Sequence, residues 1–497
     1  MIAETWRKEM RNLFGKLALG TAVAALSAVA VLPAAAQKAK CEPNYKGVEL
    51  IYITQTGPYI ASAISTAGKS WEAQTCGTVT VVEYPWSELY PKFVTSLITS
   101  AENFDGMAFP PAWAPDFTAF LSEMPEEMRK GADWDDIHPI YRDRLMVWKG
   151  KILSQTMDGD LHALTYRIDL FENPKERKNF KAKYGYELAP PKNWKEYLEI
   201  AEFFTRPKDK LWGTAEAFRR GGQQFWFFFS HAASYTNHPD HPGSMFFDPE
   251  TMDAQINNPG WVRALKEYIA ASKVAPPNAL NFSFGEVNAA VAGGQVAMSI
   301  GWGDTGVIAA DPKQSRIAGN VGSAVLPGST EIWNYKTKKW DKYDEIIRSP
   351  FMAFGGWQAA VPKFSKNKEA SWNFIKHLTS PAISGKAAVT GGTGVNPYRY
   401  SHMNNKKLWS KLFTPREADE YLAAQVDSLN AKNVALDMRL PGYFSYTEIL
   451  EIELSKALAG HVEPKVALDK IAAEWNKLTD ELGRAKQLED YRAAMGL

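Results

Sequence analysis

Two acidic residues, Asp158 and Asp160, lie on either side of Gly159 between two apolar stretches typical of β-strands. Residues two apart on an extended chain share a face, so the two carboxyl groups are expected side by side. Such a pair can act as the acid and base of an inverting glycosidase, or can accept hydrogen bonds from ligand hydroxyl groups. Neighbouring acids on one strand do not easily flank a bond from opposite sides, and we therefore prefer the binding role.

Aromatic side chains are abundant, with 17 Trp and an aromatic share of 12%. A large core explains this composition, and so does a site that grips flat apolar faces such as sugar rings. Three segments that follow predicted strands pair an aromatic residue with proline or a small polar residue, and they end in Tyr59, Trp86 and Trp113. Three such segments at one edge of a sheet predict a ligand groove.

Other chemical motifs carry less weight. His231, His238 and His241 with Asp240 hint at a metal site, but the prolines and polar residues around them favour a surface loop. A GxGxxG pattern starts at Gly301, but Pro312 stops the long helix that a dinucleotide-binding turn requires. We expect no metal, no cofactor and no catalytic nucleophile.

The charge balance and the first residues indicate an exported protein. The formal net charge is +1, which excludes the electrostatic signature of nucleic-acid binding. A basic leader is followed by an uncharged run from Leu17 to Leu32, shorter than the roughly 20 residues that span a bilayer. Small residues then precede a cleavage point between Ala36 and Gln37, so residues 1–36 are interpreted as a signal peptide and the mature chain is expected in the periplasm.

Strands and helices alternate after residue 46. Predicted strands at 47–53, 78–84 and 103–109 enclose predicted helices at 60–74 and 87–99, the pattern of a parallel sheet. The only two cysteines, Cys41 and Cys76, lie just before the first two strands. In an oxidising compartment they are expected to form a disulfide, at the edge of the sheet opposite the ligand.

The stretch GKILSQTMDGDLHALTYRIDLF, from Gly150 to Phe171, resembles one family, the maltose-binding-protein-like solute-binding proteins of carbohydrate ABC importers. Further stretches agree with it: residues 257–304, FMAFGGWQAAVP with the helix after it, and GGTGVNPYR at 391–399. In order along the chain, the matches extend from Gly47 to Leu488. The usual Pro-Tyr before the acidic step is Thr156-Met157 here.

This resemblance implies an α/β, two-lobed periplasmic-binding-protein fold of type II with three crossings between the lobes. The first lobe is expected at 42–158 and 327–390, and the second at 159–326 and 391–490. The second crossing is expected at 321–328, followed by an inserted surface hairpin at 331–345.

The implied function is capture of a carbohydrate or polyol by hinge closure and its delivery to the membrane permease of an ABC importer, by a monomer and without a cofactor. A non-sugar solute and a secreted glycan-cleaving enzyme remain as alternatives. By the resemblance, Trp302 stacks on the ligand. The other expected contacts, from the resemblance and from the patterns above, are Tyr59, Trp86, Trp113, Asp158, Asp160, Trp226, Asp304, Trp357, Arg439 and Tyr443.

Overall fold

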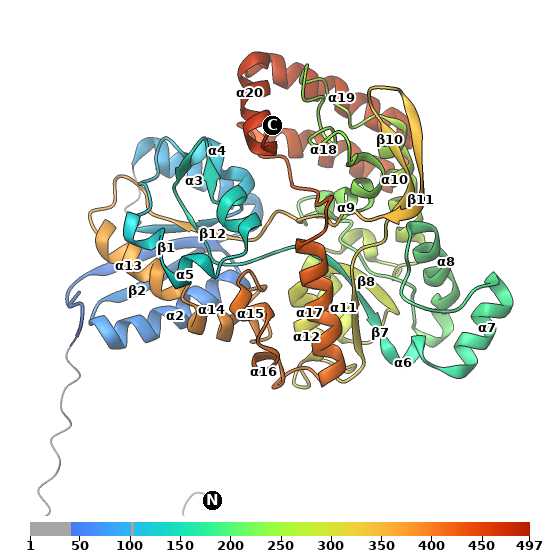
Figure 1. The fold of residues 1–497 in the computed structure, drawn as a ribbon, viewed down its shortest axis with the longest axis horizontal. Helices are drawn as coiled ribbons and strands as arrows, with labels where there is room; N and C mark the ends of the chain where they lie inside the picture. The colour runs from blue at the N-terminus through green and yellow to red at the C-terminus, as the bar shows by residue number, and fades with distance from the viewer. Residues whose placement is uncertain (1–40, 101–103) are drawn as a thin grey trace, which may run out of the picture. The chain divides into compact units, whose positions relative to one another are not determined.

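A computed structural model describes residues 41–100 and 104–497, and Figure 1 shows its ribbon. The predicted signal peptide, residues 1–36, lies outside the described residues. Among the residues described, no helix is long and apolar enough to cross a membrane.

The first of two main sheets has the order β2-β1-β3-β12-β6. Its strands are β1 (Glu49–Gln55), β2 (Thr78–Tyr84), β3 (Gly106–Phe109), β6 (Gln155–Thr156) and β12 (Gln358–Ala360). β1 pairs in parallel with β2 and β3, which confirms the predicted parallel sheet, and β12 is antiparallel to its neighbours. The predicted start of the third strand, Asn103, lies outside the described residues. The crossover helices are α2 (Tyr59–Thr75) and α3 (Trp86–Thr99), and α13 (Lys368–Leu378) packs against α2.

The second sheet has the order β8-β7-β9, with β7 antiparallel to both neighbours. Its strands are β7 (His162–Arg167), β8 (Met298–Trp302) and β9 (Val321–Ala324). The helices around it include α8 (Trp194–Phe204), α9 (Gln224–Thr236), α10 (Pro259–Lys273), α11 (Phe284–Ala292), α12 (Gly303–Ala310) and α17 (Pro415–Leu429). Figure 1 shows the two sheets apart, with the 157–161 segment running from one to the other.

The remaining elements are mostly helical. Short helices are α4 (Ala114–Phe117), α5 (Ala132–Asp135), α6 (Ile168–Phe171), α15 (Tyr400–Met403) and α16 (Lys406–Trp409). Longer ones are α7 (Pro174–Tyr184), α14 (Pro381–Ala388), α18 (Tyr443–Leu458), α19 (Pro464–Glu481) and α20 (Arg484–Met495). β4 (Val147–Trp148) and β5 (Lys151–Ile152) form a small antiparallel pair.

Asparagine, a preferred residue at helix starts, precedes α8, α10 and α13 and caps the first two. The side chains of Asn193 and Asn258 accept hydrogen bonds from backbone amides of the first turns of α8 and α10. Asn367 precedes α13, but its side chain does not cap that helix. It donates instead to Asp105 and to the carbonyl oxygen of Glu49, because a buried carboxyl group lies within its reach.

The inserted hairpin is present, but it lies with the second sheet. β10 (Ser329–Asn334) and β11 (Lys339–Ile347) pair antiparallel and pack on α9 and α10, where the rings of Tyr235 and Trp340 are 6.3 Å apart. The predicted crossing at 321–328 is therefore wrong. Residues 321–324 form β9, and the chain reaches the first sheet only at β12, because the apolar side of the hairpin is buried against α9.

The predicted disulfide is confirmed. Cys41 and Cys76 are joined, with their Cα atoms 5.7 Å apart, at the amino ends of β1 and β2. Next to the bridge, the ring of Tyr45 stacks on Trp71 of α2. The bridge thus closes the first strand–helix–strand unit at the edge opposite the carboxyl ends of its strands.

Replacing both cysteines, as Cys41→Ser with Cys76→Ser, should lower the free energy of unfolding by about 3–4 kcal/mol, because the closed loop no longer restricts the unfolded chain. Urea titration of the variant and the oxidised parent measures the difference. The parent in reductant should match the variant, and an unchanged midpoint in both would contradict the prediction.

Candidate functional site

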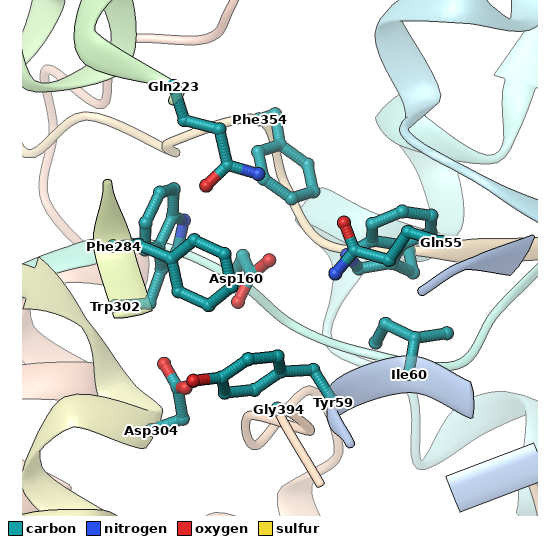
Figure 2. Close-up of a pocket in the computed structure, with 11 residues that line it drawn as sticks. Gln55, Tyr59, Ile60, Asp160, Gln223, Phe284, Trp302, Asp304, Phe354 and Gly394 are labelled. Carbon is teal, nitrogen blue, oxygen red and sulfur yellow. The ribbon is translucent and has the colours of Figure 1, made fainter. Parts of the chain in front are cut away.

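A cavity lies between the two sheets (Figure 2). Its free volume is about 30 Å³, close to the share of one water molecule in the liquid. It is lined by five aromatic rings, two carboxyl groups, two side-chain amides and two small or aliphatic residues: Tyr59, Phe284, Trp302, Phe354, Trp357, Asp160, Asp304, Gln55, Gln223, Ile60 and Gly394.

Both sheets deliver these residues through the ends of their strands. Gln55 is the last residue of β1, and Tyr59 opens the helix that follows it. On the opposite side, Trp302 ends β8 and Asp304 lies in the first turn of α12. The ring centroids of Tyr59 and Phe284, the first residue of α11, are 4.6 Å apart. The cavity therefore lies where elements of both sheets meet.

A turn at residues 354–356 fixes two of the rings. Phe354, Gly355 and Gly356 have φ angles of 51°, 78° and 85°, in the left-handed region that glycine adopts without penalty. A Cβ atom on Gly356 would lie 2.0 Å from the carbonyl oxygen of Asp158, so only glycine fits there. The turn directs Phe354 towards Trp302, with their ring centroids 6.0 Å apart, and starts the segment that carries Trp357.

The segment at 391–399 holds Asp158 and Asp160 in place through hydrogen bonds. The backbone N–H of Asn396 donates to Asp158 Oδ1 at 2.6 Å, and its side-chain amide donates to Asp160 Oδ1. A Cβ atom on Gly159 would be 2.6 Å from the carbonyl oxygen of Pro397, so glycine is needed for this approach. Three segments that run between the sheets therefore meet at residues 158–160.

Burial dominates the electrostatics of the three acids in this region. Removal from water raises the pKa of Asp304 to about 6. It also raises the pKa values of Asp158 and Asp160, and for Asp160 the neighbouring Asp158 carboxylate adds to the rise. Hydrogen bonds from Asn396 oppose these increases. No lysine, arginine or histidine is among the groups that shift the three pKa values.

A second pocket of about 310 Å³ holds another part of the predicted set. Trp86, Trp113 and Tyr443 line it, together with Phe225, Phe444 and charged groups of α18. Trp86 stacks on Trp113 with centroids 5.0 Å apart and contacts Trp357 edge-on at 6.1 Å. One continuous group of rings therefore connects this pocket to the cavity.

The structure brings five of the predicted ligand residues to the cavity: Tyr59, Asp160, Trp302, Asp304 and Trp357. Asp158, Trp226 and Arg439 are buried and line neither pocket. Trp226 donates to Asp437 at 2.8 Å. Arg439 donates to three backbone carbonyl groups, those of Pro111, Arg144 and Val147. These bonds give both residues a structural role.

Six lining residues were not singled out from the sequence: Gln55, Ile60, Gln223, Phe284, Phe354 and Gly394. Gln55 lies in a segment that was predicted to line the ligand groove, and Phe354 directly precedes the paired glycines. The sequence around both residues could therefore have indicated that they line the site. Gln223 and Phe284 had none, because each only precedes or begins a helix.

The histidine group lies only in part in the surface loop that was expected: residues 237–243 form a partly exposed loop, whereas His231 belongs to α9. His231 and His238 are buried, and His231 contacts Glu216 at 3.0 Å and stacks on Trp194. His238 contacts Asp341 of the inserted hairpin. Among the described residues, no group of three or more metal-ligating acidic, histidine or cysteine side chains is placed to hold a metal ion.

Comparison with known proteins identifies similar chains. The family described as "Bacterial extracellular solute-binding protein" matches residues 53–384, more than half of the chain. A probable amino-acid ABC transporter periplasmic-binding protein, y4oP of Sinorhizobium fredii, is 24% identical over 376 residues, which are 73% of this chain and 76% of that protein.

Solved structures share the fold. An ABC transporter solute-binding protein of Agrobacterium radiobacter K84 in complex with ribitol has a TM-score of 0.69 and 22% identity, covering 88% of this chain and 100% of that one. Maltose-bound MalE3 of T. maritima has a TM-score of 0.68 and 20% identity, covering 87% and 100%. The two-lobed α/β fold expected from the sequence is thereby confirmed.

Asp437, the partner of Trp226, should make stability depend on pH. Burial raises its pKa to about 7, despite bonds from Tyr443 and Trp226, whereas an unfolded Asp titrates near 4. The stabilising contribution is complete below about pH 4 and is lost as the pH rises to about 7, because only the unfolded chain releases this proton in that window.

Asp437→Asn keeps one oxygen that can accept from Trp226 and Tyr443 but cannot ionise. Because of Asp437, the free energy of unfolding of the parent should fall by up to about 1 kcal/mol per pH unit between about pH 4 and 7. This contribution to the slope should be absent from the variant. Urea titrations across this range measure the slope. Asp344→Asn, an exposed position on β11, is the control, and equal slopes for parent and Asp437→Asn would contradict the prediction.

Proposed function

The chain belongs to the bacterial extracellular solute-binding protein family, and we propose that it captures a carbohydrate or polyol in the cavity between its sheets for delivery to the permease of an ABC importer. Members of this family bind solutes and are not enzymes, so the glycan-cleaving alternative is set aside. The family places the protein outside the cytoplasm. Export by a cleavable leader, a periplasmic location and a monomeric state are parts of the proposal.

One observation carries the ligand class: flat aromatic faces and hydrogen-bonding groups line the same cavity. Rings such as Trp302 and Phe284 offer apolar faces to the C–H side of a sugar or polyol. Gln55, Gln223 and the carboxyl groups offer donors and acceptors to hydroxyl groups. The ribitol and maltose complexes of similar fold support this class.

An amino acid is the second candidate ligand, suggested by the name of the Sinorhizobium relative. An amino acid carries a carboxylate, which proteins usually pair with arginine or with several N–H groups. The cavity lining contains two carboxyl groups and no arginine, lysine or histidine. The like charges disfavour this candidate.

Capture would involve movement of two lobes. In this proposal the first lobe holds residues 42–158 and 351–390, and the second holds 159–350, with the inserted hairpin, and 391–490. The free volume of about 30 Å³ is far below the roughly 300–1,000 Å³ of small-molecule sites. The lobes would part to admit the ligand and close over it, as in hinge-type binding proteins.

A ligand panel tests the proposed function. The chain from Gln37 to Leu497 is screened by thermal shift against polyols, mono- and oligosaccharides, amino acids and peptides. A ligand at 100 times its dissociation constant should add about 2.7 kcal/mol to stability, seen as a raised midpoint. Stabilisation by amino acids or peptides alone would overturn the proposed class.

Phe284→Ala should weaken binding of the best sugar or polyol by about tenfold, because a ring that covers the ligand is lost. Phe284 is only partly buried at the start of α11, so the fold should be preserved. Isothermal titration calorimetry measures the affinity. Tyr400→Ala, an exposed aromatic on α15, is the matched control, and equal affinities of the two variants would contradict the site.

A further inference from the structure

The polar wall of the cavity is acidic, and no basic side chain is among the residues that line it. Asp160 and Asp304 line the cavity, and Asp158 lies against Asp160. The titratable groups that face Asp304 are Asp158, Asp160 and the phenols of Tyr59 and Tyr421. None of these groups carries a positive charge. The amino end of α12 and the amide of Asn288 supply only partial charges near Asp304.

Two glutamines in the same wall have no partner. The side chains of Gln55 and Gln223 are 6% and 5% exposed, and within the described residues neither side-chain amide makes a hydrogen bond. Figure 2 shows both amides directed towards the space among the lining residues, Gln223 from the top of the view and Gln55 from the right. The amide atoms of both side chains remain accessible from the cavity, so hydroxyl groups of a ligand can bond to them.

A positively charged nitrogen satisfies the acids better than a hydroxyl group does. Buried carboxylates are costly unless a cation or a proton accompanies them. An ammonium group supplies up to three donors and a full charge, and the faces of Tyr59, Phe284 and Trp302 attract cations. Figure 2 shows the Tyr59 phenol directed at the Asp304 carboxyl group, and Asp304 lies near enough to Asp160 to raise its pKa, so the acids and the rings line one space.

We infer that the ligand is an aminated sugar or polyol, whose protonated amino group lies between Asp160 and Asp304 and whose hydroxyl groups pair with Gln55 and Gln223. This inference rests on the proposed function and narrows its ligand class. The two amides require at least two hydroxyl partners, and a quaternary ammonium compound such as choline has only one and no N–H donor. The absence of a basic group from the lining excludes uronic acids and sugar phosphates.

Matched ligand pairs test the inference on the chain from Gln37 to Leu497. Calorimetry at about pH 7 compares D-glucamine with D-sorbitol and D-glucosamine with D-glucose, since each pair differs by one amino group. D-glucuronate and choline complete the set. The amine of at least one pair should bind about tenfold or more tightly than its hydroxyl partner, and D-glucuronate and choline should bind more weakly than that amine.

Asp304→Asn locates the effect. It keeps the shape of the side chain and removes the charge. The ratio of the affinity for the amine to the affinity for its hydroxyl partner should therefore fall towards one, while the affinity for the hydroxyl partner stays the same. Asp437→Asn, a buried acid outside the cavity, should leave the preference unchanged. If Asp304→Asn does not fold, the parent provides the same test: its preference for the amine should fall between about pH 7 and pH 5, because burial raises the pKa of Asp304 to about 6 and this acid gains its proton in that range.

The outcomes separate this inference from the function on which it rests. Neutral partners that bind as tightly as the amines overturn the inference and leave a sugar or polyol transporter. Tighter binding of D-glucuronate or choline also overturns it. An unchanged amine preference in Asp304→Asn refutes the assigned site. Both proposals are overturned if no sugar, polyol or amine binds and another class of compound in the thermal-shift panel does.

Discussion

The structure depends on a close backbone contact at residues 158–160, where three segments of the chain pass between the two sheets. Gly356 touches the carbonyl group of Asp158, Gly159 touches that of Pro397, and Asn396 bonds to both acids. No Cβ atom fits at either glycine. This contact fixes the positions of three segments that are far apart in the sequence. The cavity-lining residues next to these segments along the chain are positioned by the same contact.

This contact also explains why the cavity combines rings with uncompensated acids. Trp357 follows the glycine that touches Asp158, Asp160 follows the glycine that touches Pro397, and Gly394 lies two residues before Asn396. Burying acids without a basic partner costs free energy. The fold tolerates that cost because Asn396 and nearby backbone amides donate to the carboxyl groups.

Local patterns predicted much of the fold. The strand at 78–84 has the bounds expected from its alternation, and Asn193 and Asn258 mark helix starts because capping is a short-range interaction. Long-range packing was less predictable. The placement of the inserted hairpin against α9 has no local signal, and the structural use of Trp226 and Arg439 depends on partners more than 200 residues away. Five of eleven predicted contacts line the cavity, since strand ends can be inferred from sequence but side-chain partners cannot.

The ring group around the cavity gives the protein a built-in optical reporter. Trp86, Trp113, Trp226, Trp302 and Trp357 form a chain of neighbours with centroid separations of 5.0–6.1 Å. Indole rings this close transfer excitation energy to one another. The light is therefore emitted mainly by the ring whose excited state has the lowest energy. Trp302 and Trp357 belong to the cavity wall, and a change in the water around either one alters the light emitted by the whole group. Under the proposed function, arrival of a solute in the cavity should therefore change the tryptophan emission without an attached dye.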